Sequence, residues 1–171
     1  KDAGVTLAAG QAVVRVPAAG FALCFQRRYR EFWIEADSRG SFSREMRPDI
    51  AVESLSGEEE RLIVLDAKYR VGAGLNDALA SAHMYRDALV AADPEGRVRR
   101  IVGAAYLLSP DAPAVTGDWS SAAMPGRLFH PAYRAAFRFG AVTLTPGMTP
   151  AKIGLALDAI LRDAGGGAGE P

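Results

Sequence analysis

Cysteine and histidine are scarce in this sequence: one cysteine, Cys24, and two histidines, His83 and His130, occur among 171 residues. A single cysteine excludes an intramolecular disulfide and a cysteine-based zinc site, and two histidines alone do not complete a typical zinc ligand set. Cys24 lies in an apolar, strand-like run at residues 21–25, where a buried and unreactive thiol is the usual outcome. We therefore expect neither a disulfide nor a cysteine nucleophile.

A long apolar run and a charge excess are also missing. No stretch of 18 or more apolar residues is present, which argues against a transmembrane helix, and no signal peptide is visible; we expect a cytoplasmic protein with no membrane partner. The 20 Lys and Arg residues balance the 20 Asp and Glu residues, whereas nucleic-acid-binding domains usually carry a basic excess. Clustered arginines offset that neutrality if they contact phosphates rather than solvent; they are Arg27, Arg28, Arg30, Arg97, Arg99, Arg100, Arg134 and Arg138.

Length and composition indicate one globular domain, with 49% hydrophobic and 23% charged residues. We expect a single domain over residues 1–163 and a flexible Gly-rich tail or linker over residues 164–171. Because the first residue is Lys1 rather than methionine, we interpret the chain as a piece of a longer protein. The sequence does not indicate an oligomeric state.

The run R-L-I-V-L-D-A-K-Y at residues 61–69 predicts a buried strand that ends in charged side chains. Side chains alternate across a strand, so Asp66 and Lys68 share one face, and Ala67 and Tyr69 share the other. Residues 47–54 predict a second strand, with Asp49 and Glu53 on one face. A short polar turn at residues 56–60 joins the two strands as a hairpin, whose open end brings Asp49 and Asp66 together.

Two carboxylates and an ammonium at one point suit a particular chemistry. Carboxylate oxygens are ligands that Mg²⁺ and Mn²⁺ prefer, and a metal held there can activate a water beside a phosphodiester. Lys68 is a compact charge that can polarise the water or stabilise the transition state. The alternative is an Asp–Lys pair at a strand end on the surface, because the separate motifs P-D and D-x-K each occur often by chance.

These residues resemble the PD-(D/E)XK nuclease superfamily, and the similarity is closest to its McrC-like branch. Residues 82–88 resemble a helical M-H-x-Y-R-D-A signature, residues 102–110 a strand that ends in proline, and residues 140–147 a late G-A-x-x-L-x-P-G strand. The similarity covers about residues 20–163. Two features differ from the common pattern. Relatives often carry an acidic residue on a helix before the first core strand, whereas Glu31, Glu35 and Glu45 lie between strands, and Ser81 stands where Gln or Lys is frequent.

The resemblance implies roles for particular residues. Asp49, Asp66 and the Ala67 carbonyl would bind Mg²⁺, for which Mn²⁺ can substitute, and Lys68 would be the catalytic lysine. On the helix, Tyr85 and His83 either face the metal centre, with Tyr85 in a catalytic role, or only pack against neighbouring residues. Glu53 and His83 are possible supporting residues.

The function implied is a Mg²⁺-dependent DNA endonuclease in a restriction or anti-phage defence system. DNA would be the substrate, and other domains of the same protein or a nucleotide-driven motor partner would supply recognition and control. One alternative is an inactive nuclease-fold module that serves binding or assembly. Another is an unrelated α/β domain whose motifs are surface accidents.

We expect an α/β fold of the restriction-endonuclease-like kind, a mixed β-sheet flanked by α-helices. Residues 30–45 are not assigned to an element, although Trp33 and Ile34 are expected to pack against the core. The expected elements are a hairpin at 11–16 and 21–29, strands at 47–54 and 61–69, a helix at 76–91, a strand at 99–108, a long loop at 109–128, a short helix at 130–137, a strand at 140–145 and a helix at 150–162.

Overall fold

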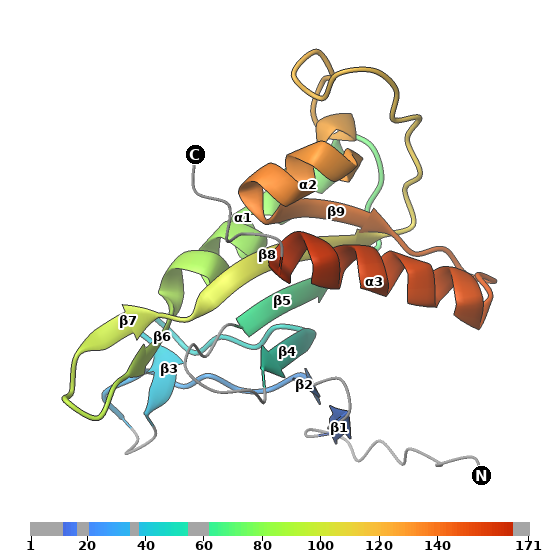
Figure 1. Ribbon diagram of the computed structural model, residues 1–171. Coiled ribbons are helices and arrows are strands. Elements are labelled where there is room, and N and C mark those ends of the chain that lie inside the picture. Colours follow the sequence, from blue (N-terminus) through green and yellow to red (C-terminus); the bar gives the residue numbers. More distant parts are fainter. Residues whose placement is uncertain (1–11, 17–20, 35–37, 55–61, 166–171) are drawn as a thin grey trace, which may run out of the picture. The chain divides into compact units, whose positions relative to one another are not determined.

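A computed structural model of the chain (Figure 1) describes residues 12–16, 21–34, 38–54 and 62–165. The polar turn expected at residues 56–60 and most of the expected tail, residues 166–171, lie outside the described residues. Among the helices in the described ranges, none has the length and apolar character needed to cross a membrane.

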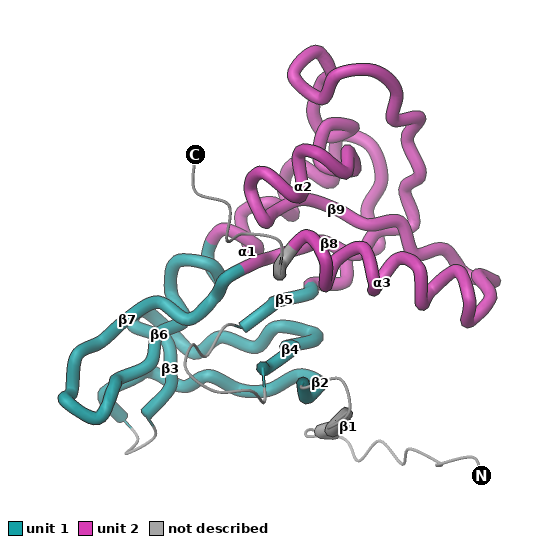
Figure 2. The backbone as a smooth tube through the Cα atoms, viewed as in Figure 1, with its two compact units in different colours: residues 1–65, 84–103 teal, residues 66–83, 104–171 magenta. Residues whose placement is uncertain are grey.

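The chain divides into two compact units, which Figure 2 shows in different colours. Unit 1 comprises residues 1–65 and 84–103, and unit 2 comprises residues 66–83 and 104–171. Hydrogen bonding gives one mixed sheet with the strand order β1-β2-β4-β5-β8-β9 and a second, three-stranded sheet with the order β3-β6-β7. Together with the helices, this arrangement confirms the expected α/β class with a mixed sheet.

The antiparallel part of the large sheet lies in unit 1. It contains β1 (Ala12–Val16), β2 (Phe21–Phe25), β4 (Ile50–Ser54) and the first four residues of β5 (Leu62–Ala67). Each strand pairs antiparallel with the next, and Ile50 pairs with Leu65. These pairings confirm both hairpins that alternating apolar residues predict.

The small sheet of unit 1 corrects two expectations. Helix α1 (Gly74–Ala88) stops at Ala88, and the chain continues directly as β6 (Leu89–Ala92), whereas the sequence predicted a helix to residue 91. The single strand expected at residues 99–108 is two strands, β7 (Val98–Arg100) and β8 (Val102–Ser109). Strand β6 pairs with β7 and also with β3 (Arg39–Ser41).

The segment before β3 also differs from expectation. Trp33 and Ile34 are 64% and 63% exposed, so neither side chain packs into a core. Gly40 instead supplies the close contact in this region, because a Cβ there would lie 2.7 Å from the Arg30 carbonyl oxygen. The backbones of residues 30 and 40 can approach each other only because residue 40 has no side chain.

Unit 2 contains a parallel strand pair and most of the helical structure. Strands β8 and β9 (Phe139–Thr143) run parallel, and the connection between them holds the long loop, a 3-10 turn and α2 (Pro131–Phe137). Helix α3 (Pro150–Gly165) follows β9 and ends three residues beyond the expected end at residue 162. The loop, the short helix, the strand and the last helix are therefore confirmed.

Candidate active site

A buried carboxylate near the end of β5 forms the centre of the candidate site. Asp66 is 2% exposed, and the ammonium of Lys68 lies 2.9 Å from its Oδ2. The two side chains meet because they are two residues apart at the end of an extended strand, as side-chain alternation predicts. A carboxylate this deeply buried requires a partner, and the neighbouring lysine supplies one.

Ser81 is the second partner of this carboxylate. Its hydroxyl lies 2.8 Å from Asp66 Oδ2 and 2.8 Å from the Ala78 carbonyl, so one hydroxyl proton serves two acceptors. Helix α1 directs Ser81 inward beside Ala78 and Ala82, which are 4% and 0% exposed. Sequence reasoning noted Ser81 only as a departure from a pattern. Its place among small apolar residues on one face of the helix is the signal that could have indicated a buried hydroxyl.

The chain that leaves β5 is fixed to the end of β8. Lys68 donates its backbone N–H to the Leu108 carbonyl at 2.8 Å, which continues the sheet pairing one residue past the last residue of β5. Ala67, whose carbonyl was predicted to bind a metal, is the exposed last residue of β5. The lysine is thus held by its backbone as well as by its ion pair.

Asp49 stands in unit 1, immediately before β4, and is half-buried. The next residue, Ile50, begins β4 and pairs with Leu65 of β5. The Asp49 carbonyl accepts a 2.8 Å hydrogen bond from the backbone N–H of Gln26, a residue with a positive φ of 48°. The residue before β4 is therefore tied to the end of β2.

Tyr85 contributes to the same segment of unit 1. Its hydroxyl donates a 3.2 Å hydrogen bond to the carbonyl of Arg47, two residues before Asp49. The Arg47 guanidinium in turn donates to the side-chain oxygen of Gln26 at 2.8 Å. Tyr85, Arg47 and Gln26 thus fix the backbone that carries Asp49, and we name these three residues the Asp49 support.

The two possible supporting residues have other partners. The ring of His83, in unit 2, stacks on Phe139 with 4.5 Å between the ring centres. The Glu53 carboxylate, in unit 1, forms ion pairs with the guanidinium groups of Arg27 at 2.5 Å and Arg39 at 3.5 Å. Both contacts stabilise the surrounding structure.

Many of the clustered arginines are engaged in ion pairs. Glu45 pairs with Arg28 through two hydrogen bonds, which lower the pKa of that carboxyl. In unit 2, Arg134 is 8% exposed and contacts Asp163 at 3.0 Å. Further pairs of this kind are Arg97 with Asp93 and Arg100 with Asp87. These arginines are therefore close to carboxylates that offset their charge.

The available ligands restrict the metals that suit this site. In the part of the chain that the structure describes, no three His, Cys, Asp or Glu residues gather as a metal-binding group. Mg²⁺ commonly binds through one or two carboxylates, with waters and substrate phosphates completing its coordination. Lys68 and Ser81 both contact Oδ2 of Asp66. Hard oxygen ligands in this number fit Mg²⁺ better than zinc.

The family model of the PD-(D/E)XK nuclease superfamily (PDDEXK_7) matches residues 1–113, which is more than half of the chain. The chain belongs to this superfamily. The matched segment includes Asp49, Asp66, Lys68 and Tyr85 and ends before β9. Searches of curated proteins and of solved structures found no match.

Proposed function

We propose that the chain is a Mg²⁺-dependent endonuclease domain that hydrolyses phosphodiester bonds in DNA. The observation that carries the proposal is the buried Asp66 carboxylate in contact with Lys68, in a chain of a nuclease superfamily. The cost of removing a carboxylate from water offsets most of the stability that its ion pair provides. The presence of a buried, paired carboxylate at a strand end therefore favours a chemical role.

Asp49, Asp66 and the Ala67 carbonyl would hold the metal, which when bound supplies positive charge to neutralise a phosphate and activate a water. Mg²⁺ commonly binds through one or two carboxylates, and waters and substrate phosphates complete its coordination. Asp49 and Asp66 would supply those carboxylates.

The chain's own residues perform the remaining tasks. Lys68 keeps a fixed ammonium beside Asp66, where it can stabilise negative charge that develops on the phosphate oxygens. Ser81 limits rotation of the Asp66 carboxylate through its 2.8 Å hydrogen bond. Tyr85 acts through the backbone at Arg47, so we assign it a positioning role for Asp49 in place of direct catalysis.

The biological setting that we propose is a restriction or anti-phage defence system of the McrC-like kind. This assignment depends on the motif resemblance at residues 82–88 and 140–147. In such a system, a nucleotide-driven motor partner or other domains of the same protein would choose the target. The domain itself would then need little DNA affinity of its own, which agrees with its zero net charge.

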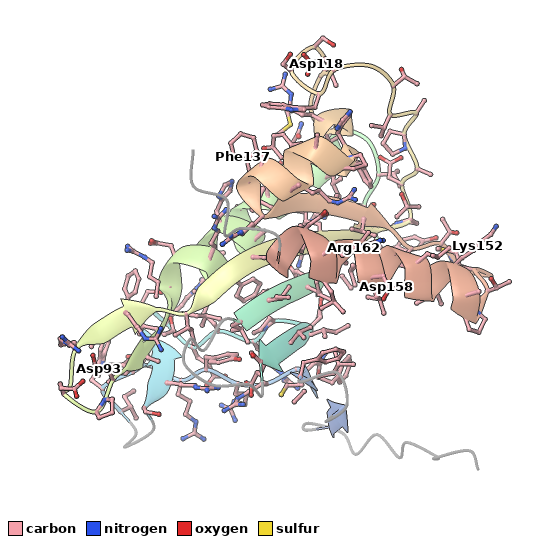
Figure 3. All side chains as sticks on the ribbon, viewed as in Figure 1. Asp93, Asp118, Phe137, Lys152, Asp158 and Arg162 are labelled. Carbon is pink, nitrogen blue, oxygen red and sulfur yellow. The ribbon has the colours of Figure 1, made fainter. Side chains whose placement is uncertain are left out.

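Cleavage assays test the proposal directly. Asp66→Asn, Asp49→Asn and Lys68→Ala should each abolish Mn²⁺-supported cleavage of plasmid DNA, with unchanged circular dichroism. Asp158→Asn and Lys152→Ala are matched controls, because both side chains are exposed on α3 (Figure 3) and should leave cleavage unchanged. Cleavage that persists in all three site variants would exclude this function.

An inactive binding module is the second candidate. Among the described residues that precede β4, no α-helix occurs that could carry an additional acidic ligand, and Glu45 is paired with Arg28. Calorimetry separates the two functions. Measurable Mn²⁺ binding that Asp66→Asn removes supports the enzyme, whereas DNA binding without any Mn²⁺ binding supports the module.

A further inference from the structure

An exposed aromatic ring directly follows the lysine of the candidate site. Tyr69 is 88% exposed, more than any other large hydrophobic side chain in the described part of the chain. The next two residues are exposed as well: the Arg70 side chain is 53% exposed, and Val71 is 59% exposed. A ring in this position buries almost no surface, so the fold gains little from it.

The backbone that presents Tyr69 is well fixed. The Arg70 N–H donates to the Lys68 carbonyl at 2.7 Å, and the Arg70 carbonyl accepts from the Ser109 hydroxyl at 2.7 Å. Two residues further on, the N–H of Gly72 donates to the Asp111 carboxylate at 2.7 Å. Hydrogen bonds therefore hold the chain on both sides of the exposed residues.

The residues that hold this loop, Ser109 and Asp111, are themselves fixed by hydrogen bonds. Asp111 donates its N–H to the Ser109 hydroxyl at 3.1 Å, and its carbonyl accepts from the Thr143 hydroxyl at 2.8 Å. The loop after β5 is thus connected to the ends of β8 and β9, all within unit 2. Because the backbone is already fixed, binding has to order only the exposed side chains, which favours affinity.

The charges beside the ring match a polyanion. Lys68 precedes Tyr69, and Arg70 follows it. The Arg70 guanidinium reaches Asp77 at 3.5 Å, but both side chains are exposed, at 53% and 79%. Exposed ion pairs of this kind contribute little to stability, so a phosphate can replace Asp77 as the partner of Arg70.

We propose that Tyr69 stacks on an unpaired base next to the scissile phosphate, an inference that rests on the proposed nuclease function. Tyr69 is the central residue of a three-residue turn that the Arg70 N–H and the Lys68 carbonyl close. Its ring is exposed, whereas the Lys68 ammonium is paired with the buried Asp66, so Tyr69 contacts a neighbouring nucleotide while Lys68 faces the reacting phosphate. A tyrosine ring can stack on any base, and such stacking does not depend on sequence.

The substrate class follows from this geometry. Within a closed duplex both faces of every base are covered by the adjacent bases, so the ring has no face to contact. A single strand, a bulge or a frayed end exposes such a face. The domain should therefore act preferentially on DNA with unpaired nucleotides, which a motor partner can generate by separating the strands.

Binding measurements in an Asp66→Asn background test the inference without cleavage. We would measure the anisotropy of a fluorescent single-stranded 20-mer, and of the same 20-mer in a duplex, at one fixed ionic strength. Tyr69→Ala should weaken single-strand binding about 5- to 150-fold, as the loss of one stacked base implies, and should change duplex binding little. Tyr69→Phe should retain the affinity because the aromatic face remains.

Val71→Ala is the matched control, since Val71 is an exposed apolar residue of the same loop without an aromatic ring; it should stay within about twofold. A 2-aminopurine in the 20-mer should be quenched by the Tyr69 protein and not by Tyr69→Ala. Equal single-strand affinity with and without the ring would overturn the inference, as expected if this surface contacts a protein. Failure of the nuclease proposal would appear separately, as absent Mn²⁺-dependent cleavage while the stacking effect remains.

Discussion

The hydroxyl of Ser81 lies 2.8 Å from Oδ2 of Asp66, the same oxygen that Lys68 approaches at 2.9 Å. A residue of α1 therefore helps to orient a carboxylate of β5. Ala78 and Ala82, on either side of Ser81 along the helix, are buried as well.

Removal of that hydroxyl should weaken catalysis without abolishing it. Because Lys68 still pairs with Asp66, Ser81→Ala should lower Mn²⁺-supported cleavage about tenfold, as the loss of a hydrogen bond to a metal ligand commonly does. Ser81→Thr retains the hydroxyl and should recover most of the rate. Ser120→Ala is the control, because the Ser120 hydroxyl bonds to Asp118 within an exposed loop. An unchanged rate in Ser81→Ala would exclude an orienting role.

The hydroxyl of Tyr85 should matter for metal affinity more than for the maximal rate. Tyr85→Phe removes the 3.2 Å hydrogen bond to the Arg47 carbonyl, so the segment before Asp49 loses one member of the Asp49 support. We expect a loss of at most about 1 kcal/mol in unfolding free energy and weaker Mn²⁺ binding that excess Mn²⁺ restores.

Titration of cleavage rate against Mn²⁺ concentration distinguishes positioning from catalysis. A direct catalytic role would lower the rate at saturating Mn²⁺ by about 100-fold or more, and that result would contradict the positioning role. Tyr133→Phe serves as the control, because the Tyr133 ring belongs to the separate aromatic cluster with Trp119 and Phe137 in unit 2.

Local sequence pattern predicted the contact of Lys68 with Asp66 because strand geometry is periodic. Alternation alone places Lys68 on the face of Asp66, whereas the register that pairs Ile50 with Leu65 came from the structure. The contact of Ser81 with Asp66 depends on how α1 packs against β5, which no local pattern specifies. Tertiary packing decides such contacts.

The helix boundary at Ala88 shows the same limit. Residues 89–92 read L-V-A-A, an apolar run that suits a helix or a buried strand equally well. Pairing of β6 with β3 and β7 decides in favour of the strand. Strand β3 is distant in the sequence and β7 follows after a turn, so the local run does not reveal either partner. Ile101 similarly divides the strand expected at 99–108, since its N–H donates to the Leu89 carbonyl.

A buried hydroxyl in unit 1 should make the protein less stable at alkaline pH. Tyr29 is 2% exposed, and within the described residues its hydroxyl has no hydrogen-bond partner. Burial, and then the negative charge of Glu53, raise the pKa of Tyr29 above its ordinary value of 10.0. Above about pH 10 the unfolded chain loses this proton while the folded protein keeps it, so stability falls as pH rises.

Tyr29→Phe should remove that dependence. At pH 7 it should be more stable by about 1 kcal/mol, because an unpartnered buried hydroxyl is lost, and its advantage should grow between about pH 9.5 and 11. Urea unfolding across this range gives the measurement, with Tyr133→Phe as the half-exposed control. Cys24, whose pKa burial also raises, is the same in both variants. Parallel losses of stability in both would contradict the assignment.

Two glycines of unit 2 should respond oppositely to the same substitution. Gly140, in β9, has a φ of 152°, and a Cβ there would lie 2.4 Å from the Leu128 carbonyl oxygen. Both the backbone conformation and the backbone contact oppose a side chain, so Gly140→Ala should cost about 3 kcal/mol or more. A Cβ added at Gly154, within α3, would have no neighbouring atom within 4 Å, so Gly154→Ala should stabilise the helix by about 0.5–1 kcal/mol.

Chemical denaturation of both variants measures the difference in their unfolding free energies, provided that the slope of free energy against denaturant concentration is the same in both. The 3-10 turn at Gly126–Phe129 and β9 are both in unit 2. The loss of stability in Gly140→Ala does not depend on nuclease activity, so it should also appear in an Asp66→Asn background. Equal midpoints for the two alanine variants would mean that the Leu128 carbonyl moves away without cost. The contact of the 3-10 turn with β9 would then not determine how this half of the domain packs.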